Sequence, residues 1–391
     1  MENPFRFGGE LNQDELVDRQ EELQQVVETI RTGEKLFLIG PRRYGKTSIL
    51  HAASQVCRAQ GVTVLRYNCE AFPTLRDLTE RIFRDATAAL ISPTAKATSS
   101  MRGLFTRLKP EISVNLLEQT VSASIGVDKE SNAAEIPLLI DALHGIEALA
   151  QKSKQPFGVI LDEFQHIIEL GGETAERQLR AAVQEHRKIG YVFAGSKTRM
   201  LAEMVSDHRR PFYRLGSRRF LGIVLRAEFI PWLIEQFGKG RFTATEENLT
   251  LLLNAAEDVP YDIQRLAHTC WSMMTGQNIK KLTPEIIVQA CRILIEQTNP
   301  LYTMTWNQLI ANQQNILLQI RPEQGTGLTT KRVSQRTGIA MTTIQKTLDA
   351  LRDKGILFTE ELPGKIKWRF EDPFFGMWIH YITAGEILVA G

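Results

Sequence analysis

Short apolar runs alternate with amphipathic stretches of helical period through residue 225 of the chain. Five of these runs read as strands, at 35–40, 62–67, 157–162, 191–195 and 220–225. Apolar strands separated by helices are typical of a parallel sheet that is covered on both faces. The pattern therefore predicts an α/β domain over residues 1–227.

Two segments between the second and third predicted strands have a different pattern. Residues 112–116 and 121–125 alternate apolar and polar side chains, which is the period of a half-exposed strand. They predict a small two-stranded hairpin inserted at about 108–128. The pattern does not indicate what this hairpin does.

The period becomes helical after the fifth predicted strand. Amphipathic stretches lie at 227–237, 246–256, 261–274 and 284–297. Thr283 followed by Pro284 is a typical helix start, and Thr298-Asn-Pro300 is typical of a domain boundary. We therefore predict an all-helical lid domain over 228–300.

The remaining residues, 301–391, predict a winged-helix domain. Its expected elements are a helix at 307–320, a helix and turn at 328–338, a second helix at 342–354 and two strands at 356–361 and 365–370. Gly355 ends the second helix, and Pro363-Gly364 joins the strands. Helix, turn, helix and hairpin in this order are typical of the winged-helix class.

Charged residues are unevenly distributed along the chain, and the basic ones gather in this last domain. The formal net charge is +2, but residues 328–370 contain nine Lys or Arg and four Asp or Glu. The basic excess is therefore concentrated in one segment.

The four cysteines, Cys57, Cys69, Cys270 and Cys291, have neither zinc-site nor disulfide spacing and indicate reduced thiols. Without a signal-peptide pattern or a run of 18 apolar residues, we expect a cytoplasmic protein with no membrane span.

The strongest chemical signal is the segment GPRRYGKT, which follows the first predicted strand and opens a helix. It fits the P-loop motif, whose curled backbone points several N–H groups at phosphate oxygens. Lys46 would reach the β- and γ-phosphates of ATP, and the Thr47 hydroxyl would bind Mg²⁺. The nucleotide-binding residues expected here are Gly40, Pro41, Arg42, Arg43, Tyr44, Gly45, Lys46, Thr47 and Ser48.

A second signal is the third predicted strand, which ends in Asp162-Glu163. Such an ending is common by itself, but it is informative downstream of a P-loop in an α/β pattern. Asp162 would hold Mg²⁺, and Glu163 would act as general base on the attacking water.

Two further features have alternative interpretations. Ser196 follows the fourth predicted strand, where it could contact the γ-phosphate or cap the next helix. A basic cluster at 208–219 is either a solvated turn or the source of an arginine finger that reaches a neighbouring subunit. Arg214 is the favoured finger, with Arg210 as the alternate.

The motifs GPRRYGKTS, ILDEFQ, FAGS and RPFYRLG, together with the opening Asn3-Pro-Phe, resemble the archaeal-type ATPase family. That family lies near the STAND ATPases and the origin-recognition branch of AAA+ proteins. The resemblance implies that Ser196 occupies the sensor-1 position and that Arg19 lies near the adenine, although Arg19 could simply precede a helix. It also implies nucleotide contact from Pro260-Tyr261 in the lid. The usual lid arginine is missing there, and Arg265 lies one turn later, which implies slow turnover.

A DNA-binding winged helix places its second helix in the major groove and its wing on the backbone. The candidate nucleic-acid contacts are Thr342, Thr343, Gln345, Lys346 and Arg352 on the helix and Lys365, Lys367 and Arg369 on the wing. Asp349 and Asp353 lie on the same helix, and many winged helices bind proteins instead.

These features together predict an ATP-dependent AAA+ switch that couples nucleotide state to homo-oligomer assembly and to double-stranded DNA. The alternative is a STAND-like regulatory ATPase whose winged helix binds a protein partner. A small-molecule kinase is disfavoured, because no acceptor pocket is identifiable in the C-terminal region.

Overall fold

The computed structural model describes residues 2–90, 110–115, 120–125, 135–153, 155–196 and 198–387. Its contacts divide the chain into two compact units. The sheet unit comprises Glu10–Pro41 and Lys46–Gly222, and the C-terminal unit comprises Met1–Gly9, Arg42–Gly45 and Ile223–Gly391. Four residues of the predicted P-loop are thus assigned to the C-terminal unit.

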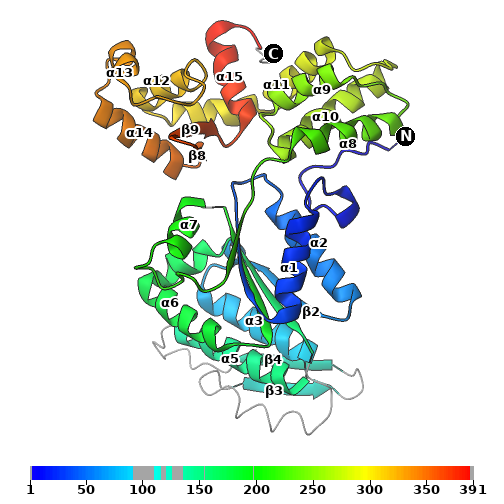
Figure 1. Cartoon of the computed structure of the whole chain (residues 1–391), viewed down its shortest axis with the longest axis vertical. Coiled ribbons are helices and arrows are strands. Elements are labelled where there is room, and N and C mark those ends of the chain that lie inside the picture. Colours follow the sequence, from blue (N-terminus) through cyan, green and yellow to red (C-terminus); the bar gives the residue numbers. More distant parts are fainter. Residues whose placement is uncertain are drawn as a thin grey trace. The chain divides into compact units, whose positions relative to one another are not determined.

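A five-stranded parallel sheet forms the centre of the sheet unit (Figure 1). Its strands, in spatial order, are β2 (Thr63–Asn68), β5 (Phe157–Asp162), β6 (Ile189–Gly195), β1 (Lys35–Ile39) and β7 (Ser217–Phe220). The α/β prediction is confirmed. The strand order adds that β6 lies between β1 and β5, so the carboxyl ends of these three strands are neighbours.

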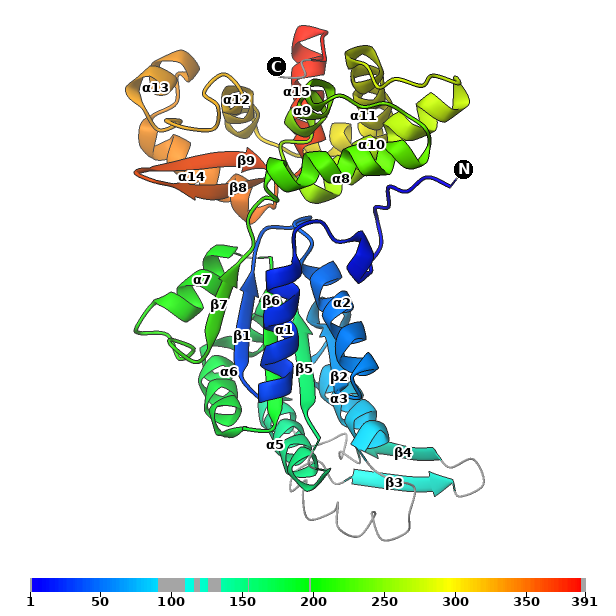
Figure 2. The same cartoon turned by 45° about the vertical axis from the view of Figure 1, so that its right-hand side comes forward.

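Helices cover both faces of this sheet (Figure 2). One face carries α1 (Gln20–Thr32) and α2 (Lys46–Ala59), and the other carries α3 (Leu75–Leu90), α5 (Glu135–Ser153), α6 (Gln165–Glu185) and α7 (Thr198–Ser206). Because side chains alternate along a strand, Leu36 and Leu38 pack in one core while Phe37 and Ile39 pack in the other. The described part of this unit also contains two short 3₁₀ helices, Gln13–Glu15 and Cys69–Ala71.

The fifth strand was predicted in the wrong place. The apolar run 220–225 was expected to form it, but β7 comprises Ser217–Phe220, with Ser217 opposite Leu36 and Phe220 opposite Ile39. An edge strand is covered on one side only, and the polar residues Ser217, Arg218 and Arg219 make up most of β7, so the segment gives no apolar signal. The predicted hairpin is present: β3 (Pro110–Asn115) and β4 (Thr120–Ile125) pair antiparallel.

Four helices open the C-terminal unit after the last strand of the sheet. They are α8 (Arg226–Lys239), α9 (Glu246–Ala255), α10 (Pro260–Gly276) and α11 (Pro284–Asn307). The N-terminal segment belongs to the same unit: the Phe5 ring is buried against Trp232, Phe237 and Trp271. The opening Asn3-Pro-Phe is therefore an anchor of this helical layer.

No loop lies at the predicted boundary Thr298-Asn-Pro300, because α11 continues through it to Asn307, and the boundary itself stays a prediction. Pro300 cannot donate its backbone bond, but side chains support the helix around it. Thr298 donates to the Leu294 carbonyl at 2.9 Å, and Asn299 accepts a bond from the Trp378 indole at 2.7 Å. Trp378 lies on α15 (Pro373–Ala384), a helix that the sequence pattern did not predict.

The other elements of the C-terminal unit have the predicted order. They are α12 (Ala311–Ile320), α13 (Lys331–Thr337), α14 (Met341–Asp353), β8 (Leu357–Leu362) and β9 (Lys365–Phe370), with β8 and β9 paired antiparallel. The assignment of these elements to the winged-helix class stays a prediction. None of the helices in the described ranges has the length and apolar character needed to cross a membrane.

Candidate functional site

The loop between β1 and α2 has the backbone of a phosphate cradle. The chain leaves β1 at Ile39 and enters α2 at Lys46, and Gly45 has a φ of 89°, which favours glycine. Lys46 is buried, and its ammonium donates to the carbonyl oxygens of Gly40 at 2.9 Å and Pro41 at 2.8 Å. The positive end of α2 and one ammonium group thus lie beside the same loop, as anion binding requires.

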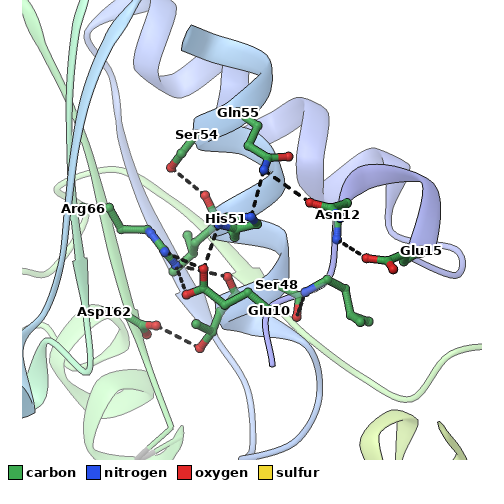
Figure 3. Close-up of polar contacts among 12 residues, drawn as sticks. Glu10, Asn12, Glu15, Ser48, His51, Ser54, Gln55, Arg66 and Asp162 are labelled. Carbon is green, nitrogen blue, oxygen red and sulfur yellow. Dashed lines mark hydrogen bonds and ion pairs between the residues drawn. The ribbon is translucent and has the colours of Figure 1, made fainter. Parts of the chain in front are cut away.

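A hydroxyl and a carboxylate meet beside this loop. Thr47 Oγ1 donates to Asp162 Oδ2 at 3.0 Å (Figure 3). Burial raises the pKa of Asp162, and the Glu163 carboxylate raises it further, against the opposing effects of Lys46 and Thr47. A hydroxyl and a buried carboxylate at this separation fit a small divalent cation such as Mg²⁺, which prefers oxygen ligands.

The next residue, Glu163, has a φ of 50°, in the left-handed region. Its Oε2 accepts bonds from the Ser196 amide at 3.1 Å, the Ser196 hydroxyl at 2.8 Å and the Gln165 amide at 2.5 Å. Burial alone would raise the pKa of Glu163, but these bonds and the Lys46 ammonium outweigh it and lower the pKa. Glu163 is therefore held as a carboxylate at the end of β5.

The strand order explains why these groups meet. β6 lies between β1 and β5, so Ser196 at its end lies between the cradle and the two carboxylates. Backbone bonds fix the three ends to one another: Gly40 N–H donates to Gly195 O at 3.4 Å, and Phe164 N–H donates to Ala194 O at 2.9 Å. The position of Ser196 at this edge is a consequence of topology.

Residues 15–193 match the protein family described as the AAA ATPase domain. The predicted resemblance to the AAA+ ATPases is thereby confirmed over this part of the chain. No curated protein sequence matches the chain significantly.

Solved structures extend the similarity beyond the AAA ATPase domain. A Walker-type ATPase of Pyrococcus abyssi is similar over 96% of this chain and 99% of its own, with a TM-score of 0.62 and 14% identity. At this identity the similarity establishes the fold alone. The Aeropyrum pernix ORC1 protein, solved in complex with DNA, covers 95% of both chains at 11% identity with a TM-score of 0.49. The ADP form of the Aeropyrum pernix ORC2 protein also has a TM-score of 0.49, at 16% identity, over 99% of this chain and 97% of its own.

The two candidate finger arginines of the sheet unit have different surroundings. Arg210 pairs with Glu176 at 2.6 Å, and the Glu176 side chain is only 1% exposed. Moving Arg210 away would leave a buried carboxylate without its partner, which is costly. Arg214 is exposed, has a φ of 58° and contacts the Tyr213 ring at 5.0 Å. The geometry therefore favours Arg214.

Two other predicted nucleotide-binding residues lie near the start of the AAA ATPase domain. Arg19 is buried, donates to the Gly222 carbonyl at 2.6 Å and pairs with Glu22 at 3.6 Å. Ser48 is buried on α2 and accepts a bond from the Leu11 amide at 3.3 Å. Both residues fix the segment before α1 to the sheet unit.

Sequence reasoning missed a polar network beside Thr47. Glu10 pairs with His51 Nδ1 and with Arg66 Nη1, each at 2.7 Å (Figure 3). Arg66 also donates to the Thr47 carbonyl at 3.5 Å. It also missed Gln165, which lies two residues after Glu163 in the ILDEFQ segment. A polar residue at the buried start of a helix was the only available signal for Gln165.

The rest of the predicted loop residues have contacts inside the C-terminal unit. Arg43 pairs with Asp262 at 3.3 Å and with Asp372 at 3.2 Å, and Tyr44 lies edge-on to Phe358. Burial raises the pKa of Asp262 to about 7, against the effect of Arg43. Arg42 is exposed.

The predicted lid residues also lie in the C-terminal unit. Pro260 is the first residue of α10, and the Tyr261 amide donates to the Arg43 carbonyl at 3.3 Å. Arg265, considered as a lid sensor, donates to Thr298 at 2.9 Å and lies 5.5 Å from the Phe374 ring.

The predicted nucleic-acid contacts divide into accessible and engaged residues. Those on α14 and β9 that are exposed or half-buried are Thr342, Thr343, Gln345, Lys346, Arg352, Lys365 and Lys367. Arg352 is engaged by Asp349 at 2.8 Å. The prediction for Arg369 is wrong, because its side chain is buried and contacts Glu360, Glu257 and the Glu257 carbonyl.

Proposed function

We propose that this protein binds Mg²⁺ and ATP at the carboxyl edge of its sheet and hydrolyses the ATP slowly. One observation carries the proposal: Lys46, the Thr47–Asp162 pair and the Glu163–Ser196 pair follow three adjacent strands at one edge. Phosphate binding, metal binding and proton transfer need these groups within a few ångströms of one another.

The cradle would bind the triphosphate through the amides at the start of α2 and through the Lys46 ammonium, which would exchange its carbonyl partners for phosphate oxygens. Thr47 and Asp162 would hold Mg²⁺. The bound cation would neutralise charge that develops on the phosphate oxygens.

Hydrolysis would use Glu163 as the proton acceptor. The oxygen of a water molecule forms a bond to the γ-phosphorus while the bond to the bridging oxygen of ADP breaks. The proton lost by the water goes to the Glu163 carboxylate, whose lowered pKa keeps it ionised beforehand. Ser196 holds this carboxylate and could also contact the γ-phosphate.

Glu163→Gln tests the chemical step. This variant should bind ATP like the wild-type chain, while its hydrolysis rate falls by about 10²–10⁴-fold, the usual contribution of a general base. Radiolabelled ATP gives both quantities, as filter-retained nucleotide and as released phosphate. Glu185→Gln is the control, because Glu185 is exposed at the end of α6. Hydrolysis at the wild-type rate by Glu163→Gln would remove Glu163 from the mechanism.

ATP binding would also control assembly and a second macromolecule. Arg214, the exposed arginine of the basic cluster, would reach the γ-phosphate of a neighbouring copy of this chain. The surface of α14 and β9, with Lys346, Lys365 and Lys367, would bind the backbone of double-stranded DNA.

A protein partner is the second candidate for the α14 and β9 surface. The engagement of Arg352 by Asp349 and the burial of Arg369 leave fewer free cations there than the sequence suggests. DNA binding by the whole chain, measured at several salt concentrations, separates the two candidates. Three lysine contacts give a slope of log K against log salt of about −2.7. Lys346→Ala removes one contact and should reduce the magnitude of the slope by about 0.9. Salt-independent or absent binding favours the protein partner.

A further inference from the structure

Gln165 is the second side chain that holds Glu163, and it does so from a buried position through a short hydrogen bond. It lies at the start of α6, where its side chain is buried with an exposure of 1%. Its Nε2 donates to Glu163 Oε2 at 2.5 Å, the shortest of the three bonds to that oxygen. A charge-assisted bond of this kind is about twice as strong as one between neutral groups.

The other end of the same amide has no partner among the described residues. Gln165 Oε1 is buried and accepts no hydrogen bond from any of them. An unpaired buried acceptor costs about 1–3 kcal/mol, so a glutamine that served only packing would be replaced by an apolar residue. Turning the amide over would not help, because Oε1 would then face the Glu163 carboxylate.

The neighbouring strand makes room for this arrangement. A Cβ atom at Gly195 would lie 2.1 Å from Gln165 Oε1, so only glycine at this position leaves space for the amide. The Glu163 backbone, at a φ of 50°, adds a second local cost at the same point. Local costs of this kind persist where they serve function.

We propose that Gln165 is a positioning residue that fixes the Glu163 carboxylate for proton transfer. The inference rests on the proposed function. Gln165 and Ser196 both donate to Oε2, and none of the described residues donates to Oε1. Oε2 is therefore the anchored oxygen and Oε1 the one that receives the proton from water. Ser196 can turn to the γ-phosphate without releasing Glu163, because Gln165 still holds it.

Gln165→Met tests this role, because methionine has a similar length and volume but cannot donate. The catalytic rate should fall about 10–100-fold, since loss of orientation alone costs up to about 10²-fold. The dissociation constant of ADP should stay within twofold of wild type, because the hydrogen bond of Gln165 goes to Glu163 and not to the cradle. Gln165→Glu also offers no donor when ionised and should lose at least as much rate.

Two controls separate positioning from folding. Gln178→Met makes the same change at an exposed site on α6 and should have no effect. Adding Gln165→Met to Glu163→Gln should lower the residual rate by less than twofold, because the group that Gln165 positions is already gone.

The outcomes are distinguishable. Wild-type hydrolysis no faster than that of Lys46→Ala would overturn both the proposed function and this inference. An active wild type with an equally active Gln165→Met variant would overturn the inference alone. So would a rate loss that multiplies with that of Glu163→Gln, or one matched by an equal loss of ADP affinity.

Discussion

Each end of the central sheet has a buried carboxylate, but the pKa values of the two carboxylates are shifted in opposite directions. At the carboxyl end, Asp162 is buried beside Glu163, and burial together with that neighbouring charge raises its pKa. At the amino end, Glu147 on α5 is equally buried, with an exposure of 5%, yet its pKa is lowered. The difference lies in how many donors each carboxylate has.

Glu147 is fully satisfied by the protein itself. It accepts bonds from the backbone amides of Arg187, Lys188 and Ile189 at 2.9–3.1 Å and from the side chain of Gln151 at 3.0 Å. Although burial opposes ionisation, these bonds lower the pKa of Glu147. The carboxylate thus closes the turn between α6 and β6.

A histidine and a tyrosine complete the amino-end cluster. His186 bonds through Nδ1 to the Tyr191 hydroxyl at 2.7 Å and through Nε2 to His144 at 2.9 Å. Both ring nitrogens are therefore used within the protein. A perturbed pKa alone does not identify a functional site; a site also needs polar groups whose partners can be exchanged or are absent.

Replacing the buried carboxylate by an amide at each end of the sheet should give the largest difference between the two ends. Asp162→Asn should lower ATP hydrolysis by about 10²–10³-fold, because the amide is a poor Mg²⁺ ligand. The free energy of unfolding should be unchanged or higher by about 1 kcal/mol, because a costly buried charge is removed. Phosphate release and urea unfolding give the two values. A large loss of stability would show that Asp162 is structural.

Glu147→Gln should have the opposite result. The new amide group presents N–H donors to backbone N–H donors, so the free energy of unfolding should fall by about 3 kcal/mol. Hydrolysis at 25 °C should stay within about twofold of wild type while the chain remains folded. Glu185→Gln, at the exposed end of α6, is the control for both measurements. A loss of hydrolysis without a loss of stability would place Glu147 in a functional site.

A smaller effect is expected in the pH dependence of the free energy of unfolding. Burial lowers the pKa of His186 from 6.5 to about 4, and His144 and Lys35 also oppose protonation, while Glu147 favours it. The folded chain therefore binds this proton more weakly than the unfolded chain. The resulting contribution of His186 to the free energy of unfolding is fully present above pH 6.5 and is lost as the pH falls from 6.5 towards 4. Urea unfolding should show a flatter pH dependence for His186→Gln over this range, and an unchanged dependence would contradict the assignment.

The sequence was most informative where a motif and its local structure coincide. Lys46, Thr47 and Asp162 could be assigned because a P-loop needs a strand before it and a helix after it, and both are local features. The position of Ser196 between the loop and the carboxylates depends on β6 lying between β1 and β5. No local pattern contains that order.

The errors have the same origin in non-local contacts. Arg369 lies at the same alternation as Lys365 and Lys367, but Glu257, far away in sequence, covers it. Helix α11 passes through Pro300 because α15 packs on it and supplies Trp378. Gln165 could not be recognised, since its function depends on the bond to Glu163.

We propose that nucleotide binds to the groups that follow β1 and not to those that precede it. The most direct test is calorimetric titration of a non-hydrolysable ATP analogue with Mg²⁺ into the wild-type chain, Lys46→Ala and Lys35→Ala. Lys35 begins the same strand and donates to the carbonyls of Gly33 and His186. We expect one nucleotide per chain for the wild type and for Lys35→Ala, with binding at least about 100-fold weaker for Lys46→Ala, since hydrogen bonds to charged groups contribute up to about 3 kcal/mol. Equal affinity in all three proteins, or no binding in any, would contradict the account.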